Sequence, residues 1–138
     1  MKPRLAITIG DVNGIGPEVI VKTLQNPESL APCRPLIVGS FEALARYAQN
    51  SDTLASVARL NESDLDSLSV EGSAWREDRV SILEPSGLPV PKIVPGKVSA
   101  DAGKFAFACV ELAVRLALDG RVDAVVTCPV NKSAVNLA

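Results

Sequence analysis

Two short segments of this chain combine glycine, carboxylate, hydroxyl and lysine residues in patterns suited to anion binding. The first, residues 9–18 (IGDVNGIGPE), follows a short apolar run and places Asp11, Gly14 and Gly16 just before Pro17. Proline suits the first position of a helix, and a glycine turn before it leaves free backbone N–H groups at the helix N-terminus. Such a terminus attracts anions. The alternative interpretation is a tight turn that only packs a helix on a sheet.

The glycine segment matches neither of the two common phosphate-binding fingerprints. Val19 stands where a dinucleotide fingerprint needs its third glycine, and no Gly-Lys-Ser/Thr follows Gly10 as a P-loop requires. Asp11 could ligate a metal ion, but capping the turn through its own side chain is the more common role. The segment is therefore a candidate for anion binding in its general form only.

The second segment, residues 127–132 (TCPVNK), follows another apolar run and offers Thr127, Asn131 and Lys132. Open parallel sheets bind ligands beyond the carboxyl ends of their strands. Lys132 could meet a phosphate or a carboxylate as a point charge. A solvated lysine in the first turn of a helix is the alternative.

The composition excludes several kinds of catalysis. The chain has no histidine, so it cannot assemble an imidazole-bound zinc or iron site, a Ser-His-Asp triad or a Cys-His pair. Its cysteines, Cys33, Cys109 and Cys128, are widely spaced and are expected to be reduced thiols. Cys128 lies in the second segment but has no histidine to activate it. We therefore expect Cys128 to be a packed or merely exposed thiol and not a nucleophile.

Apolar runs alternate with helical patterns along the chain. Runs typical of buried strands lie at residues 5–9, 36–40, 79–84 and 123–127. Helical patterns lie at residues 18–25, 41–49 and 99–119, with a further helix starting at 131–133 and weak helical faces within 51–72. Four prolines make residues 85–97 an extended connection. This order predicts right-handed crossovers and a parallel α/β sheet.

The predicted helix at residues 99–119 is apolar nearly all the way round, so it must be covered on more than one side. A sheet of a few strands covers one side only. The remainder implies another chain, or more of this protein. The last helical pattern reaches Ala138 without a cap or a glycine stop, as expected of a truncated product.

Length and charge narrow the class of protein further. The 138 residues are 47% hydrophobic, which indicates a globular domain. A net charge of −2 argues against a general nucleic-acid or membrane-surface binder. No signal peptide and no membrane-spanning run of 18 apolar residues is visible. We therefore expect a cytoplasmic protein with neither nucleic acid nor membrane as a partner.

Four segments, in order and with matching spacing, resemble the 4-hydroxythreonine-4-phosphate dehydrogenase (PdxA) family. Residues 9–18 resemble its opening Gly-Asp-Pro-Ala-Gly-Ile-Gly-Pro-Glu signature, and residues 36–40 resemble its second strand. Residues 96–103 (GKVSADAG) are similar to its Gly-x-x-Ser-x-x-x-Gly entry to a long helix. Residues 122–132 (VDAVVTCPVNK) are similar to its Asp-Ala-(apolar)₂-Thr-x-Pro-x-x-Lys block.

The resemblance implies a fold and an activity. The fold is α/β, a three-layer α/β/α parallel-type sheet like those of isocitrate and isopropylmalate dehydrogenases, and incomplete here. Residues 1–138 would form the N-terminal portion of a two-lobed enzyme. The activity is the NAD-dependent (or NADP-dependent) oxidation, then decarboxylation, of 4-phosphooxy-L-threonine in pyridoxal 5'-phosphate biosynthesis. The enzyme would be a homodimer with a divalent metal such as zinc, magnesium or cobalt, held by residues outside this chain.

On the same resemblance, six residues lie near the cleft between the lobes: Asp11, Gly14, Gly16, Thr127, Asn131 and Lys132. Departures from the family pattern are Val12-Asn13, where Pro-Ala is usual, and Cys128, where a small residue is usual, which argues against a catalytic thiol. The family's chain is roughly twice as long or more, and its histidines have no counterpart here. Residues 1–138 alone are therefore expected to be inactive.

Two other functions stay open. One is a dehydrogenase of the same fold that acts on another phosphorylated hydroxy acid, such as a phosphothreonate or a phosphoerythronate. The other is a non-catalytic α/β module, which would bind an anion at residues 14–16 or use the apolar helix at 105–118 as an interface.

Overall fold

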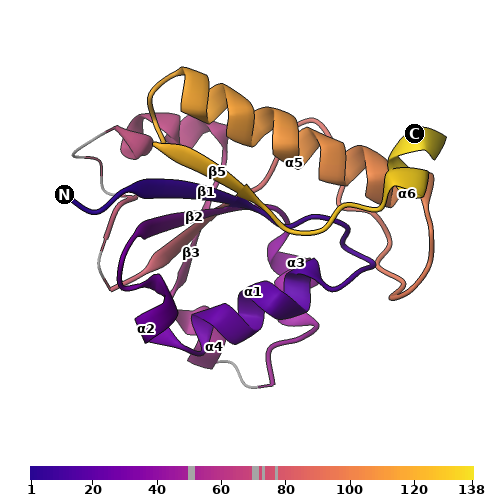
Figure 1. Ribbon diagram of the computed structural model, residues 1–138, viewed down its shortest axis with the longest axis horizontal. Coiled ribbons are helices and arrows are strands. Elements are labelled where there is room, and N and C mark those ends of the chain that lie inside the picture. Colours follow the sequence, from indigo (N-terminus) through magenta and orange to yellow (C-terminus); the bar gives the residue numbers. More distant parts are fainter. Residues whose placement is uncertain (50–51, 70–71, 73, 77) are drawn as a thin grey trace.

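The computed structural model describes residues 1–49, 52–69, 72, 74–76 and 78–138. Strands and helices alternate along most of the chain (Figure 1). In order they are β1 (Arg4–Thr8), α1 (Gly16–Leu24), α2 (Pro27–Leu30), β2 (Arg34–Val38), α3 (Phe41–Ala45), α4 (Asp52–Ala55), β3 (Val57–Leu60), η1 (Glu62–Leu68, a 3-10 helix), β4 (Val80–Leu83), α5 (Ala100–Leu118), β5 (Ala124–Thr127) and α6 (Lys132–Leu137).

The strands form one sheet in the order β3-β4-β2-β1-β5, and every neighbouring pair is parallel. Figure 1 shows α5 along one face of this sheet and α1 to α4 on the other. The predicted parallel α/β sheet in three layers is therefore confirmed. β1 lies between β2 and β5, and Thr8 is in register with both Val38 and Thr127. The carboxyl ends of β1 and β5 consequently meet at one edge of the sheet.

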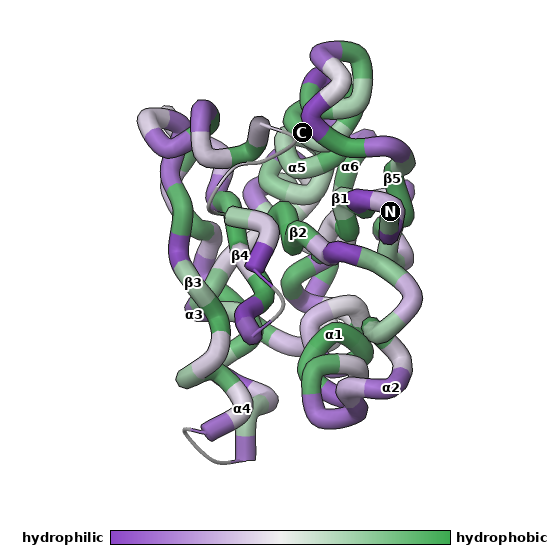
Figure 2. The backbone as a smooth tube through the Cα atoms, turned by 90° about the vertical axis from the view of Figure 1, so that its left-hand side faces the viewer, coloured by the Kyte–Doolittle hydropathy of each residue, from purple (hydrophilic) through white to green (hydrophobic). Residues whose placement is uncertain are grey.

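The long helix begins and ends where its sequence predicts. The Ser99 side chain caps α5 by accepting a hydrogen bond from the Ala102 backbone N–H at 3.3 Å, and Gly120 follows shortly after the last turn. Figure 2 shows the predominantly hydrophobic character of this helix. Neither α5 nor any other helix in the described ranges is long and apolar enough to cross a membrane.

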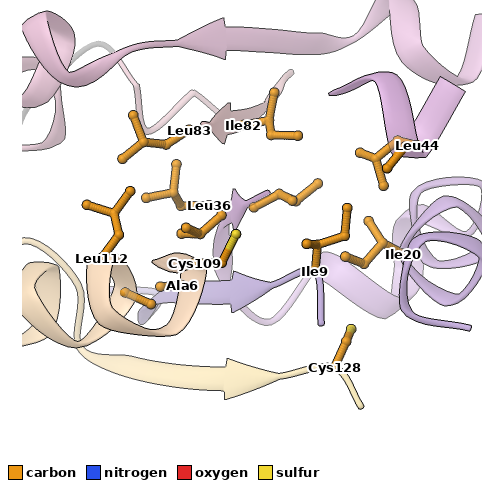
Figure 3. Packing of buried hydrophobic residues seen from close by; sticks show 14 of the residues in the cluster. Ala6, Ile9, Ile20, Leu36, Leu44, Ile82, Leu83, Cys109, Leu112 and Cys128 are labelled. Atoms are coloured by element: carbon orange, nitrogen blue, oxygen red, sulfur yellow. The ribbon is translucent and has the colours of Figure 1, made fainter. Parts of the chain in front are cut away.

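Buried aliphatic side chains from the sheet pack against α5 and α1 (Figure 3). Ile9 and Leu36 are fully buried, and Figure 3 shows Leu36 near Leu112 and Cys109 of α5 and Ile9 beside Ile20 of α1. The outer face of α5 stays open: its exposed large side chains are Phe107 (52%), Val114 (44%) and Leu118 (81%). The sheet thus covers one side of this helix, and apolar side chains stay exposed on the other, where its sequence requires further cover.

The structure corrects the expectation for residues 51–72. We expected weak helical faces there, but residues 57–60 form the edge strand β3, which pairs with β4. Tertiary pairing overrides the local helical pattern at this point. Glu62–Leu68 forms a 3-10 helix, and residues 51, 70 and 71 lie outside the described residues. The helix expected at 41–49 is shorter, ending at Ala45, and the short helix α2 was not expected, whereas α4 lies within the region where helical faces were expected.

Candidate functional site at the carboxyl edge of the sheet

The six predicted site residues lie in or directly beside the two loops that leave the adjacent strands β1 and β5. Residues 9–16, here called the glycine turn, connect β1 to α1, and residues 128–131 connect β5 to α6. The Asp11 backbone N–H donates to the Pro129 carbonyl at 3.0 Å, and the Cys128 backbone N–H donates to the Thr8 carbonyl at 3.1 Å. The structure therefore brings the two segments singled out by sequence into direct contact. Whether they line a cleft stays a prediction.

Gly16 is required by close packing. A Cβ atom at this position would lie 2.0 Å from the Ile9 carbonyl oxygen and 3.1 Å from the Cys128 Cβ. The first turn of α1 thus lies against the end of β1 and the loop after β5. This observation supports the packing interpretation of Gly16, whereas a Cβ at Gly14 would meet nothing closer than 3.4 Å.

Asp11 acts as a cap of the glycine turn. Its side chain is buried, with the residue 6% exposed, and Oδ1 accepts a hydrogen bond from the Asn13 backbone N–H at 2.9 Å. This is the turn-capping geometry expected of aspartate. Within the described ranges, no three His, Cys, Asp or Glu side chains gather as metal ligands.

The N-terminus of α1 carries no side-chain cap. Ile15 occupies the cap position and makes no capping hydrogen bond through its side chain, and Pro17 follows at the start of the helix. Glu18, in the first turn, pairs with Lys22 at 2.8 Å. First-turn N–H groups without a side-chain acceptor are compatible with an anion at this terminus.

Asn131 and Lys132 begin α6. The Asn131 side chain caps the helix by accepting a hydrogen bond from the Ala134 backbone N–H at 3.1 Å. Lys132 is exposed, as is Thr127. Lys132 borders an open hollow of about 320 Å³, lined also by Phe107, Val110, Val130, Val135 and Asn136. The lysine is thus available to a ligand, and its immediate neighbours are mainly apolar.

Cys128 follows β5 directly (Figure 3). The residue is 9% exposed, and burial raises the pKa of its thiol. A neutral, buried thiol is a poor nucleophile, so the geometry supports the expectation that Cys128 is not catalytic.

Sequence reasoning missed the role of Asn13, which it noted only as a departure from the family pattern. Its buried side chain binds residues 94–97, a segment more than 80 positions away. Lys97 thereby joins the same edge of the sheet. No spacing rule reveals so distant a contact, and the one signal in the sequence is a second polar residue, besides Asp11, in a turn made of glycine and apolar residues.

Comparisons with known proteins agree over nearly the whole chain. Residues 31–138 match the family model described as "Pyridoxal phosphate biosynthetic protein PdxA". The D-threonate 4-phosphate dehydrogenase of Cupriavidus necator is 38% identical over 97% of this chain, and the 4-hydroxythreonine-4-phosphate dehydrogenase of Geobacter metallireducens is 37% identical over 99%. The chain spans 38% of the length of each of these relatives.

Solved structures of dehydrogenases also resemble this chain along nearly its whole length. A 4-hydroxythreonine-4-phosphate dehydrogenase from Burkholderia phymatum superposes with a TM-score of 0.79 at 31% identity, covering 99% of this chain and 39% of that one. A terephthalate 1,2-cis-dihydrodiol dehydrogenase from Burkholderia xenovorans superposes at 0.69 with 30% identity, covering 100% and 37%. Sequence and fold together show that this chain belongs to the PdxA family.

Proposed function

We propose that this chain is the N-terminal portion of a two-lobed, NAD-dependent (or NADP-dependent) dehydrogenase that acts on a phosphorylated hydroxy acid. The supporting observation is that the match to dehydrogenases of this kind runs through 97–99% of the chain while covering 38% of theirs. In this proposal the two contacting loops at the carboxyl edge face the cleft between the lobes.

The primary substrate candidate is 4-phosphooxy-L-threonine, oxidised and then decarboxylated in pyridoxal 5'-phosphate biosynthesis. D-Threonate 4-phosphate is the second candidate, because the C. necator relative carries that name at 38% identity. Both compounds combine a phosphate, a carboxylate and an oxidisable hydroxyl group. The exposed lysine at position 132 and the uncapped start of α1 are suited to one of the anionic groups.

The described residues contribute scaffold and anion binding, and we assign them no metal or cofactor contact. The Asp11 carboxylate is buried and already accepts the Asn13 N–H, and the glycine turn has no dinucleotide fingerprint. A divalent metal such as zinc, magnesium or cobalt would be held by residues outside this chain. A homodimeric assembly and a cytoplasmic location belong to the same proposal.

The test compares two recombinant proteins, the complete enzyme that carries these residues and residues 1–138 alone. Each is supplied with NAD, a divalent metal and each phosphorylated acid in turn, and NADH formation is followed by absorbance. We expect turnover by the complete enzyme and none by residues 1–138. Turnover by residues 1–138 would show that the reactive groups lie within this chain, and no turnover by the complete enzyme on either acid would refute the assignment.

A further inference from the structure

Asn13 makes four hydrogen bonds, of which three join the glycine turn to a distant loop and one lies within the turn. The residue is 2% exposed; its Oδ1 accepts from the Val94 N–H at 2.7 Å and its Nδ2 donates to the Lys97 carbonyl at 3.0 Å. Its backbone carbonyl accepts from the Gly96 N–H at 2.7 Å, and its backbone N–H donates to Asp11 at 2.9 Å. Both ends of the buried amide therefore have partners, as burial requires.

The loop held by Asn13 is itself a well-defined turn. The Lys97 N–H donates to the Val94 carbonyl at 3.0 Å, with Pro95 and Gly96 between them. Gly96 has a φ of +78°, and proline followed by a glycine of positive φ is the signature of a type II turn. The Lys97 backbone is thus fixed twice, once within its own turn and once by Asn13.

Among the described residues, Lys97 has no carboxylate partner. Its side chain is exposed, and no ion pair within the described ranges includes it. The glycine turn therefore makes two contacts with segments that carry an exposed lysine. Asn13 binds the turn that ends at Lys97, and Asp11 binds the loop that leads to Lys132.

We propose that Asn13 is a positioning residue, which presents Lys97 to one anionic group of the substrate. This inference rests on the proposed function, in which the substrate carries a phosphate and a carboxylate and so needs more than one cation. A lysine side chain is long and flexible, and fixing its backbone reduces the ordering that binding demands. Asn13 supplies that fixation from the glycine turn itself.

A purely structural role for Asn13 leads to a different expectation. If Asn13 only anchored the loop, its loss would lower stability, and the remaining folded molecules would bind substrate with an affinity unrelated to Lys97. If Asn13 acts through Lys97, the two substitutions must be coupled in a double-variant cycle.

The experiment measures the dissociation constants of 4-phosphooxy-L-threonine and D-threonate 4-phosphate for the complete enzyme by isothermal titration calorimetry. The variants are Lys97→Ala, Asn13→Ala, the double variant, and Lys92→Ala as a matched control. Lys92 is an exposed lysine of the same loop, with no hydrogen bond to Asn13 among the described contacts. Thermal unfolding of each variant reports its stability separately.

We expect Lys97→Ala to weaken binding about tenfold without lowering the unfolding temperature, because a charge-assisted contact is lost from an exposed side chain. Asn13→Ala should weaken binding by a smaller factor, the double variant should bind no more weakly than Lys97→Ala, and Lys92→Ala should bind normally. If Asn13→Ala does not fold, Asn13→Asp takes its place in the cycle, because it keeps an acceptor for the Val94 N–H and loses the donor to the Lys97 carbonyl.

An unchanged affinity in Lys97→Ala, or additive losses in the double variant, would overturn this inference and leave the proposed function intact. Failure of the unsubstituted enzyme to bind either acid would overturn both. The two failures are distinguishable because the second is seen before any variant is made.

Discussion

Arg4 and Asp123 tie together the amino-terminal ends of two neighbouring parallel strands. The guanidinium donates from Nε to Oδ2 at 3.1 Å and from Nη2 to Oδ1 at 2.7 Å, and the Arg4 backbone N–H also donates to Oδ2 at 2.7 Å. Arg4 is buried, whereas the Asp123 side chain is 47% exposed. The pair lies at the opposite end of β1 and β5 from the candidate site, so its role is structural.

The ion pair makes stability depend on pH in acid. Hydrogen bonds from Arg4, helped by its charge, lower the pKa of Asp123 to about 2. The carboxylate is therefore favoured in the folded protein, and its stabilisation is complete above the unfolded-state pKa of about 4 and lost as the pH falls toward 2. Asp123→Asn should lower the free energy of unfolding at pH 7 by about 1 kcal/mol, a figure limited by solvent screening.

Urea unfolding between pH 2 and pH 7 checks this prediction. The difference between Asp123→Asn and the unsubstituted protein should shrink as the pH approaches 2. Glu111→Gln, at an exposed position of α5 outside the described ion pairs, is the control and should change little. A difference that does not vary with pH would contradict the assignment to the ion pair.

Gly16 and Gly14 should respond differently to the same substitution. Gly16→Ala places a Cβ 2.0 Å from the Ile9 carbonyl oxygen, a backbone atom that cannot move aside freely. We expect a loss of about 3 kcal/mol in the free energy of unfolding, at the upper end for overpacking. Gly14→Ala, whose nearest contact is 3.4 Å, should cost less than about 1 kcal/mol. Equal losses in urea unfolding would show that the glycine turn is not packed as described.

Two phenylalanines of α5 provide a second matched pair. Phe105 is 1% exposed and packs on the sheet, whereas Phe107, on the outer face, is 52% exposed. Phe105→Ala should lower the free energy of unfolding by about 3–4 kcal/mol, and Phe107→Ala by less than about 1 kcal/mol. Thermal and urea unfolding measure both. A large loss for Phe107→Ala would mean that its face of the helix is covered in solution.

The three cysteines should be alkylated in order of exposure. Cys109 is buried, and burial raises the pKa of its thiol to about 12. Cys33 is partly exposed. Burial raises the pKa of its thiol too, and the charge of Lys2 offsets part of that rise. Iodoacetamide at pH 8 should therefore modify Cys33 first and Cys109 only after unfolding. Peptide mapping by mass spectrometry follows each site, and guanidinium-unfolded protein, where all three should react, is the control. Early labelling of native Cys109 would refute this order.

Much of the fold could be predicted because its signals are local. The apolar runs before Gly10 and Gly39 became parallel strands, and Ser99 capped the long helix as its position suggested. Strand β3 could not be predicted, since Val57–Leu60 is short and becomes a strand only by pairing with β4. Local patterns thus identified the elements whose signal lies in their own residues.

The candidate site also has one part that could be predicted from the sequence and one part that could not. Proximity of residues 11–16 and 127–132 followed from the rule that parallel strands end at one edge. The buried bonds of Asn13 to Val94 and Lys97 did not, because they depend on how an irregular, proline-rich loop returns to the sheet. Loop return is set by tertiary packing, which has no periodicity in the sequence.

The position of β1 between β2 and β5 has a consequence during synthesis on the ribosome. One side of β1 finds its neighbour in residues 34–38, but the other must wait for β5, since Arg4 meets a partner 119 positions further along. While residues 39–123 are being synthesised, the nascent sheet therefore ends at an unpaired β1. An exposed edge strand of this kind pairs readily with strands of other chains. Pairing of residues 124–127 with β1 removes this exposed edge as soon as β5 has been made.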